Sequence, residues 1–137
     1  MNTTKFFHLA RNASQYSDFD NAISRHLGCV IVYKNRIISV GWNCDKQHPL
    51  QKKYNKERGF NTTNCKNSLH AEIHALIKCQ GVDVDWSKTA VFIYREFANG
   101  KTALAKPCKA CQKAIRDKGI KRVYYTTEFG YRKEVFN

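Results

Sequence analysis

Residues 70–81 of the chain read HAEIHALIKCQG, and this stretch decides the fold. Apolar residues recur in it at helical spacing, so we predict a helix over residues 70–80 that Ser68 caps and Gly81 ends. The next apolar run, AVFIY at residues 90–94, is short and predicts a strand that is buried on both faces.

A second helix and a second strand follow in the same order. We predict a helix over residues 108–118, because Pro107 stands at the expected first-turn position and Gly119 supplies a stop. Residues 121–126, KRVYYT, predict a strand, and residues 135–136 are interpreted as the stub of a last one. This alternation predicts an α/β fold in which βαβ units form a sheet with parallel members, covered by helices.

The chain before this stretch adds a hairpin and a helix. The β-branched runs CVIVY at residues 29–33 and RIISVGW at residues 36–42 are separated by Lys34 and Asn35, which predicts two strands joined by a tight turn. Residues 3–14 have near-helical apolar spacing and predict an amphipathic first helix. The polar residues 43–69 are interpreted as a long loop or insertion of the kind that often carries function.

The composition is that of one globular domain. With 137 residues, 42% of them hydrophobic, the chain fits a single domain over residues 1–137. The N-terminus lacks the features of a signal peptide, and no stretch approaches the roughly 20 apolar residues of a membrane span. We therefore expect a cytoplasmic protein with no membrane association, whose six cysteines are reduced and serve a metal or catalysis where they cluster.

The chain is strongly basic. Its 24 Lys and Arg residues exceed its 11 Asp and Glu residues, for a formal net charge of +13, which favours an anionic partner. Because the basic residues are dispersed, a merely solvated surface is the alternative interpretation. The charge indicates phosphate groups without saying whether they belong to a nucleotide or to a single-stranded nucleic acid.

Potential metal ligands stand at the start of both predicted helices. His70 begins one, and Cys108 and Cys111 begin the other, which places them at one edge of the sheet. Two thiolates and an imidazole suit zinc, and three protein ligands leave a fourth tetrahedral position for water, as in a catalytic site. Zinc lowers the pKa of such a water toward about 7. Glu72, two residues beyond the histidine, suits a general acid and base aimed at that water.

A closed structural zinc site with a fourth protein ligand is the alternative. The residues available for it are Cys44, His48, Cys65, His74 and Cys79. The catalytic interpretation is favoured because His-Ala-Glu begins one helix and Pro-Cys-x-x-Cys begins the next after an intervening strand. We interpret His74 as a pocket-wall or structural residue, since the site already has room for its water.

These motifs resemble the cytidine deaminase superfamily, on the branch of the deoxycytidylate (dCMP) deaminases and tRNA adenosine deaminases. The resemblance covers most of the chain and includes HLGCVIV at residues 26–32, GWN at residues 41–43 and GIKRV at residues 119–123. It implies a three-layer α/β/α fold with a five-stranded mixed sheet, a zinc cofactor and a glutamate that carries protons without binding the metal.

The resemblance also implies substrate contacts. Asn43 matches an asparagine that contacts the sugar or base, and backbone N–H groups near Ala71 and Cys108 would line the pocket; a turn residue is the alternative for Asn43. Residues 44–69 are an insertion, and the last strand and helix of relatives look shortened or absent. Some dCMP deaminases bind a second zinc in the inserted region. For Cys44, His48 and Cys65, ordinary thiols and side chains are the favoured alternative, because no tight C-x-x-C spacing is present.

The leading functional hypothesis is a zinc-dependent hydrolytic deaminase that converts cytosine to uracil in a nucleotide or single-stranded nucleic acid. An adenosine-to-inosine deaminase acting on RNA is the first alternative. A non-catalytic, zinc-stabilised module that binds nucleic acid is the second, and the presence of Glu72 argues against it. The sequence leaves open the molecule that carries the base and the association of several copies of the chain.

Overall fold

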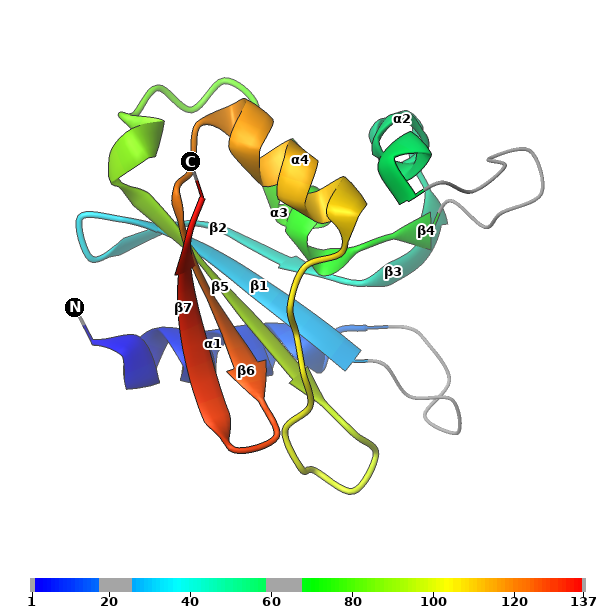
Figure 1. Ribbon diagram of the computed structural model, residues 1–137, viewed down its shortest axis with the longest axis vertical. Helices are drawn as coiled ribbons and strands as arrows, with labels where there is room; N and C mark the ends of the chain where they lie inside the picture. The colour runs from blue at the N-terminus through cyan, green and yellow to red at the C-terminus, as the bar shows by residue number, and fades with distance from the viewer. Residues whose placement is uncertain (1, 18–25, 59–67, 137) are drawn as a thin grey trace.

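A five-stranded mixed sheet forms the centre of the molecule (Figure 1). The computed structural model describes residues 2–17, 26–58 and 68–136. The strand order is β2-β1-β5-β6-β7, and β5 and β6 are parallel whereas the other neighbouring pairs are antiparallel. The strands are β1 (His26–Tyr33), β2 (Arg36–Trp42), β5 (Thr89–Glu96), β6 (Arg122–Thr127) and β7 (Gly130–Val135). The predicted α/β class and the five-stranded mixed sheet are therefore confirmed.

The first two strands form the predicted hairpin. Lys34 and Asn35 have φ angles of 50° and 62°, the left-handed geometry that a two-residue turn needs to match the twist of its strands. Asparagine tolerates this geometry better than most residues, because its short polar side chain can bond locally. Strand β1 begins at His26, earlier than the apolar run that predicted it.

Helices cover both faces of the sheet, as the three-layer prediction requires (Figure 1). Helix α1 (Thr3–Ser14) lies on one face, with the bounds that its apolar spacing predicted. Helices α3 (Ala71–Ile77) and α4 (Lys109–Lys118) lie on the other. Within the described ranges, no helix combines the length and the apolar character that crossing a membrane requires.

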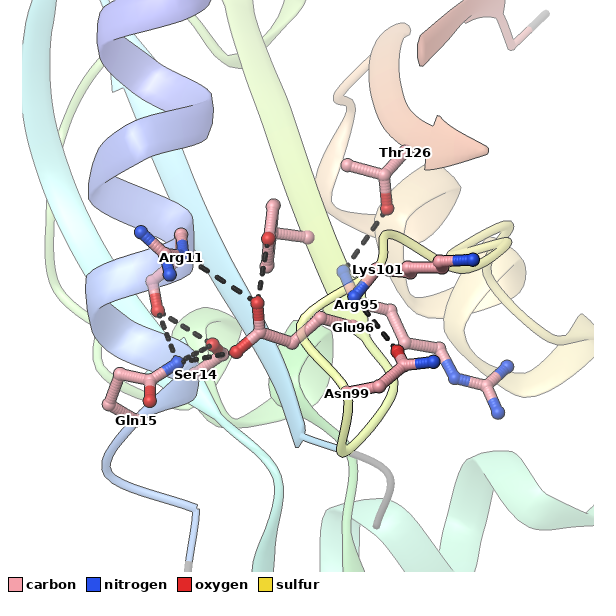
Figure 2. Close-up of polar contacts among 9 residues, drawn as sticks. Arg11, Ser14, Gln15, Arg95, Glu96, Asn99, Lys101 and Thr126 are labelled. Atoms are coloured by element: carbon pink, nitrogen blue, oxygen red, sulfur yellow. Dashed lines mark hydrogen bonds and ion pairs between the residues drawn. The ribbon is translucent and has the colours of Figure 1, made fainter. Parts of the chain in front are cut away.

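Aromatic packing and a polar cluster hold α1 against the sheet. The rings of Phe6 and Phe7 each lie 5.3 Å from that of Phe92, centroid to centroid. Near the other end of α1, Glu96 of β5 accepts a hydrogen bond from Gln15 Nε2 at 3.0 Å and pairs with Arg11 Nε at 3.5 Å (Figure 2). The helix is thus joined to β5 by both its apolar and its polar residues.

On the opposite face, a glycine lets α3 approach β2. A Cβ atom built on Gly41 would lie 2.5 Å from the backbone nitrogen of Ala75, closer than real Cβ contacts come. The hydroxyl of Ser39 donates to the carbonyl oxygen of Ala75 at 2.7 Å and adds a polar contact at the same place. Because α3 follows His70 directly, this close packing also places the first of the predicted metal ligands.

Both site helices begin one residue later than predicted. His70 and Cys108 are the N-cap residues of α3 and α4, with extended backbones. The prediction that Ser68 caps α3 is wrong, because Ser68 pairs with Gln47 in a short second sheet. Pro107 likewise precedes the N-cap instead of standing in the first turn. Gly119 ends α4 in the left-handed conformation, as predicted, with a φ of 98°.

The last strand is longer than predicted. Strand β7 spans Gly130–Val135 and pairs antiparallel with β6, whereas the sequence indicated only a stub at residues 135–136. It is an edge strand whose residues are nearly all exposed, so it lacks the apolar pattern by which strands are found in a sequence. No helix follows it within the described residues.

The polar stretch predicted as a loop contains regular structure. It forms β3 (Cys44–Gln47), α2 (Pro49–Asn55), the 3₁₀ turn η1 (Lys56–Arg58) and β4 (Ser68–Leu69), and a second 3₁₀ turn, η2 (Trp86–Lys88), lies before β5. His48 caps α2 by accepting the N–H of Leu50 at 3.0 Å, and Pro49 takes the first helical position. Two of the residues that α2 buries, Gln51 and Asn55, are polar, so the helix shows no apolar stripe.

Candidate metal centre

The structure brings the three predicted ligands together. Cys108 Sγ and Cys111 Sγ lie 3.6 Å and 3.4 Å from His70 Nδ1, and the three ligand atoms all lie within 4.8 Å of one another. They meet because α3 and α4 begin at the same edge of the sheet and pack side by side on one face (Figure 1). Of all the residues that the structure describes, only these three form such a group of His, Cys and acidic side chains.

The electrostatics of the cluster place one thiolate among the three ligands. The hydrogen bond from Cys111 lowers the pKa of Cys108 to about 3, and the neighbouring His70 acts in the same direction. Burial raises the pKa of Cys111, which therefore keeps its proton beside the Cys108 thiolate. For His70, burial opposes the charged form, yet the hydrogen bond with Cys108 leaves its pKa raised. A thiolate is thus present at neutral pH, in the form that binds metals.

The donor set fits zinc. Two sulfurs and one imidazole nitrogen are ligands of the softness that zinc prefers, and a tetrahedral ion held by three of them has one position left for a small molecule. The imidazole uses Nδ1 toward the sulfurs, so Nε2 points to other parts of the protein. The cluster of His70, Cys108 and Cys111 therefore fits zinc.

Glu72 lies in the first turn of α3 and is buried. The residue is 3% exposed, and its Oε1 has no hydrogen-bond partner. Burial raises the pKa of Glu72, while the nearby His70 acts in the opposite direction and a hydrogen bond with Cys111 favours the charged form. Buried carboxylate oxygens normally have hydrogen-bond partners. An unpaired carboxylate oxygen beside a group of metal-binding side chains is typical of a residue that acts on a bound substrate.

Asn43 and Ala71 lie at the same edge as the cluster. Cys44, next to Asn43, pairs with Leu69, which directly precedes His70. The side-chain oxygen of Asn43 accepts the N–H of Leu27 at 3.0 Å, so it also joins β1 to the end of β2. Ala71 is the first residue of α3 and fully buried. Their roles toward a substrate stay predictions.

The candidates for a fourth ligand lie elsewhere or outside the described residues. Cys44 Sγ donates to the carbonyl oxygen of Trp42 at 3.3 Å and lies 3.6 Å from His74 Nδ1. His74 accepts the N–H of Trp42 at 3.1 Å and packs edge-on against its ring at 4.7 Å. His48 caps α2. Cys65 lies in residues 59–67, outside the described residues.

Sequence reasoning missed three polar residues that surround His70. Gln51, Asn55 and Arg58 come from α2 and η1, and Gln51 Oε1 accepts the backbone N–H of His70 at 3.0 Å. Arg58 Nη1 lies 3.4 Å from His70 Nε2. A polar residue that is buried through contacts with a distant segment looks like a surface residue in one sequence, so no pattern marked them.

Comparison with known proteins agrees with this geometry. A family model described as the cytidine and deoxycytidylate deaminase zinc-binding region matches residues 1–127. A search among curated protein sequences finds no match.

Solved structures extend the comparison. A dCMP deaminase of the cyanophage S-TIM5 is 26% identical with a TM-score of 0.61, covering 91% of this chain and 82% of its own. A cytidine deaminase from Burkholderia pseudomallei is 15% identical with a TM-score of 0.67, covering 98% of this chain and 93% of its own. A tRNA:A34 deaminase structure is 20% identical with a TM-score of 0.53, covering 91% of this chain and 76% of its own. At 15% and 20% identity the last two show only the fold. Because the family model spans nearly the whole sequence, the chain belongs to the cytidine and deoxycytidylate deaminase zinc-binding family.

Proposed function

We propose that this protein is a hydrolytic deaminase that converts cytosine to uracil in a nucleotide or a single-stranded nucleic acid. The observation that carries the proposal is the unpaired, buried Oε1 of Glu72 beside the cluster of His70, Cys108 and Cys111. A structural zinc site has no use for such a carboxylate, whereas a hydrolytic site needs a group that moves protons.

The roles of the residues follow from this arrangement. His70, Cys108 and Cys111 would hold zinc, which when bound would act as a Lewis acid that activates water and stabilises the negative charge on the oxygen that adds to the reacting carbon. Glu72 accepts a proton from the attacking water and delivers it to N3 of the base. Glu72 then carries the second proton of that water to the departing amine. The C4–N bond breaks, a C4–O bond forms, and the products are uracil and ammonia.

Binding and orientation of the substrate fall to residues at the same edge. We assign Asn43 to the sugar or base, and the backbone near Ala71 and Cys108 to the pocket wall, within a single domain over residues 1–137. The starts of α3 and α4 present backbone N–H groups that the helices themselves leave without partners, and such groups suit the oxygen atoms of a polar ligand.

A cytosine nucleotide is the favoured substrate class. The relative that is 26% identical is a dCMP deaminase, which supports a pyrimidine nucleotide over adenosine in tRNA. The formal net charge of +13 supports a substrate that carries phosphate. Both observations agree with a free nucleotide, and the charge also agrees with a nucleic acid strand.

The test is a parallel assay by mass spectrometry. The zinc-loaded protein is incubated with cytidine, CMP, dCMP, adenosine, single-stranded DNA and RNA, and the conversion of an amine to a carbonyl is measured. We expect turnover of a cytosine-containing compound. Turnover of adenine in RNA alone would replace the proposal with RNA editing. Binding of single-stranded DNA or RNA without deamination of any compound would favour the alternative of a non-catalytic module that binds nucleic acid.

A further inference from the structure

Helix α2 contacts the backbone of a metal ligand. The side chain of Gln51 is fully buried, and its Oε1 accepts the N–H of His70 at 3.0 Å. His70 precedes α3 with an extended backbone, so its N–H belongs to none of the hydrogen bonds within the helix. Gln51 therefore supplies the acceptor that this part-buried N–H requires.

The amide of Gln51 is itself held in place. Its Nε2 donates to Asn55 Oδ1 at 2.8 Å, one helical turn further along α2, and Asn55 is also fully buried. Arg58 Nη1 lies 3.5 Å from the same oxygen and 3.4 Å from His70 Nε2. The four residues close a ring of polar contacts that begins at the backbone of His70 and ends at its imidazole.

A role in stability alone explains this arrangement poorly. Burying two amides removes both from water, and their hydrogen bonds to each other and to His70 recover little beyond that cost. Apolar side chains of similar volume would hold α2 as well. What the amides add is a fixed direction, because Asn55 determines which atom of Gln51 faces the N–H of His70.

We propose that Gln51, oriented by Asn55, is a positioning residue of the zinc site. By fixing the backbone of His70 it keeps Nδ1 turned toward the sulfurs of Cys108 and Cys111, and it thereby slows the release of zinc. Groups that hold metal ligands in place typically contribute 10- to 100-fold to metal affinity. The inference rests on the zinc site of the proposed function and is independent of its substrate.

The experiment measures zinc release from the purified, zinc-loaded full chain to an excess of a coloured chelator. Gln51→Met keeps the length of the side chain but lacks a strong acceptor, and we expect release about 10-fold faster than in the wild type. Gln51→Glu keeps an acceptor toward His70, and Asn55 can turn its amide to donate to it. We expect release from Gln51→Glu within about twofold of the wild type.

A matched control separates positioning from general weakening of α2. Tyr54 lies on the same helix, and its hydroxyl donates to Asp117 Oδ2 of α4 at 2.9 Å. Tyr54→Phe removes this contact and leaves the polar ring intact, so we expect a lower melting temperature with zinc release at the wild-type rate. The visible spectrum of the Co²⁺-loaded protein gives a second readout, in which Gln51→Met and not Tyr54→Phe should change the thiolate bands.

Each result decides the proposal. Wild-type release from Gln51→Met, or equal acceleration by Tyr54→Phe, would overturn it. If Gln51→Met does not fold, Asn55→Ala is compared with Asn55→Asp, which keeps the oxygen that orients Gln51. Faster release from the alanine variant alone supports the proposal, and equal rates refute it. Since no substrate is used, a protein that retains zinc as expected but deaminates nothing would contradict the proposed function and not this inference.

Discussion

Replacing Glu72 by glutamine removes the proposed proton carrier with almost no change of shape. Glu72 is 3% exposed and its Oε1 has no hydrogen-bond partner, so the substitution breaks no hydrogen bond of that atom. A positioned general acid or base contributes about 10²- to 10⁴-fold to a rate. Because Glu72 would serve two proton transfers, we expect a loss near the upper end, which corresponds to about 5 kcal/mol in the activation free energy.

The same substitution should not destabilise the fold. Burial raises the pKa of Glu72, because desolvation disfavours the charged carboxylate. Glutamine carries no charge and avoids this desolvation cost, so we expect the melting temperature of Glu72→Gln to equal or exceed that of the wild type. Activity and stability would then change in opposite directions, as they do at a site where function and not stability selects the residue.

The assay is ammonia release from the substrate that the wild type turns over fastest. Zinc content and melting temperature are measured on the same preparations. Glu128→Gln, the same substitution at an exposed position in the turn between β6 and β7, serves as the control and should keep full activity. Near-normal turnover by zinc-loaded Glu72→Gln would refute the proton-carrier role. A large loss of zinc from this variant would show that Glu72 acts on the metal site instead.

Four further predictions follow from the structure. Elemental analysis should find one zinc per chain in the wild type and almost none in Cys108→Ser, since the cluster has only three ligands. Two zinc ions per chain would instead indicate a second zinc site. Gly41→Ala should lower the free energy of unfolding by about 1–3 kcal/mol and reduce zinc content, because a Cβ collides with the backbone of α3; unchanged urea midpoints would contradict this packing. Burial, and then Lys78, lowers the pKa of His74 below 6.5. The stability that neutral His74 contributes is therefore present above pH 6.5 and is lost as the pH falls through the folded-state pKa. In urea titrations, the free energy of unfolding should fall less between neutral pH and about pH 5 for His74→Asn than for the wild type. If the charge of +13 serves a nucleic acid, the affinity for single strands should fall with salt by a log–log slope of about −0.7 per contacted phosphate, and binding that is undetectable at low salt would restrict the charge to a nucleotide or to solubility.

Much of the fold could be predicted because it rests on local patterns. The bounds of α1 and β2, the turn at Lys34 and Asn35 and the stop at Gly119 follow from apolar periodicity and backbone preferences within a few residues. The spacing of Cys108 and Cys111 is equally local, since both stand at the start of one helix. These features need no knowledge of distant contacts, so one sequence is enough to find them.

Burial of polar residues and pairing at the edge of the sheet could not be predicted in this way. The exposed strand β7 has no apolar alternation, and its existence depends on the hydrogen bonds that β6 offers. The residues of α2 resemble a charged surface until they are placed against α4 and the N-cap residue of α3. In such cases the partner group, and not the residue type, decides the structure.

The sequence by itself determined which residues could bind zinc and carry protons, because residue type and spacing specify that chemistry. Only the tertiary structure decided how they are held. It brings His70 within 3.6 Å of both sulfurs, leaves Oε1 of the buried Glu72 unpaired, and turns Gln51 of a segment predicted as a loop toward the backbone of His70. These contacts join segments far apart in the chain, and they form only when the packing of the sheet and its helices brings the helix starts to one edge.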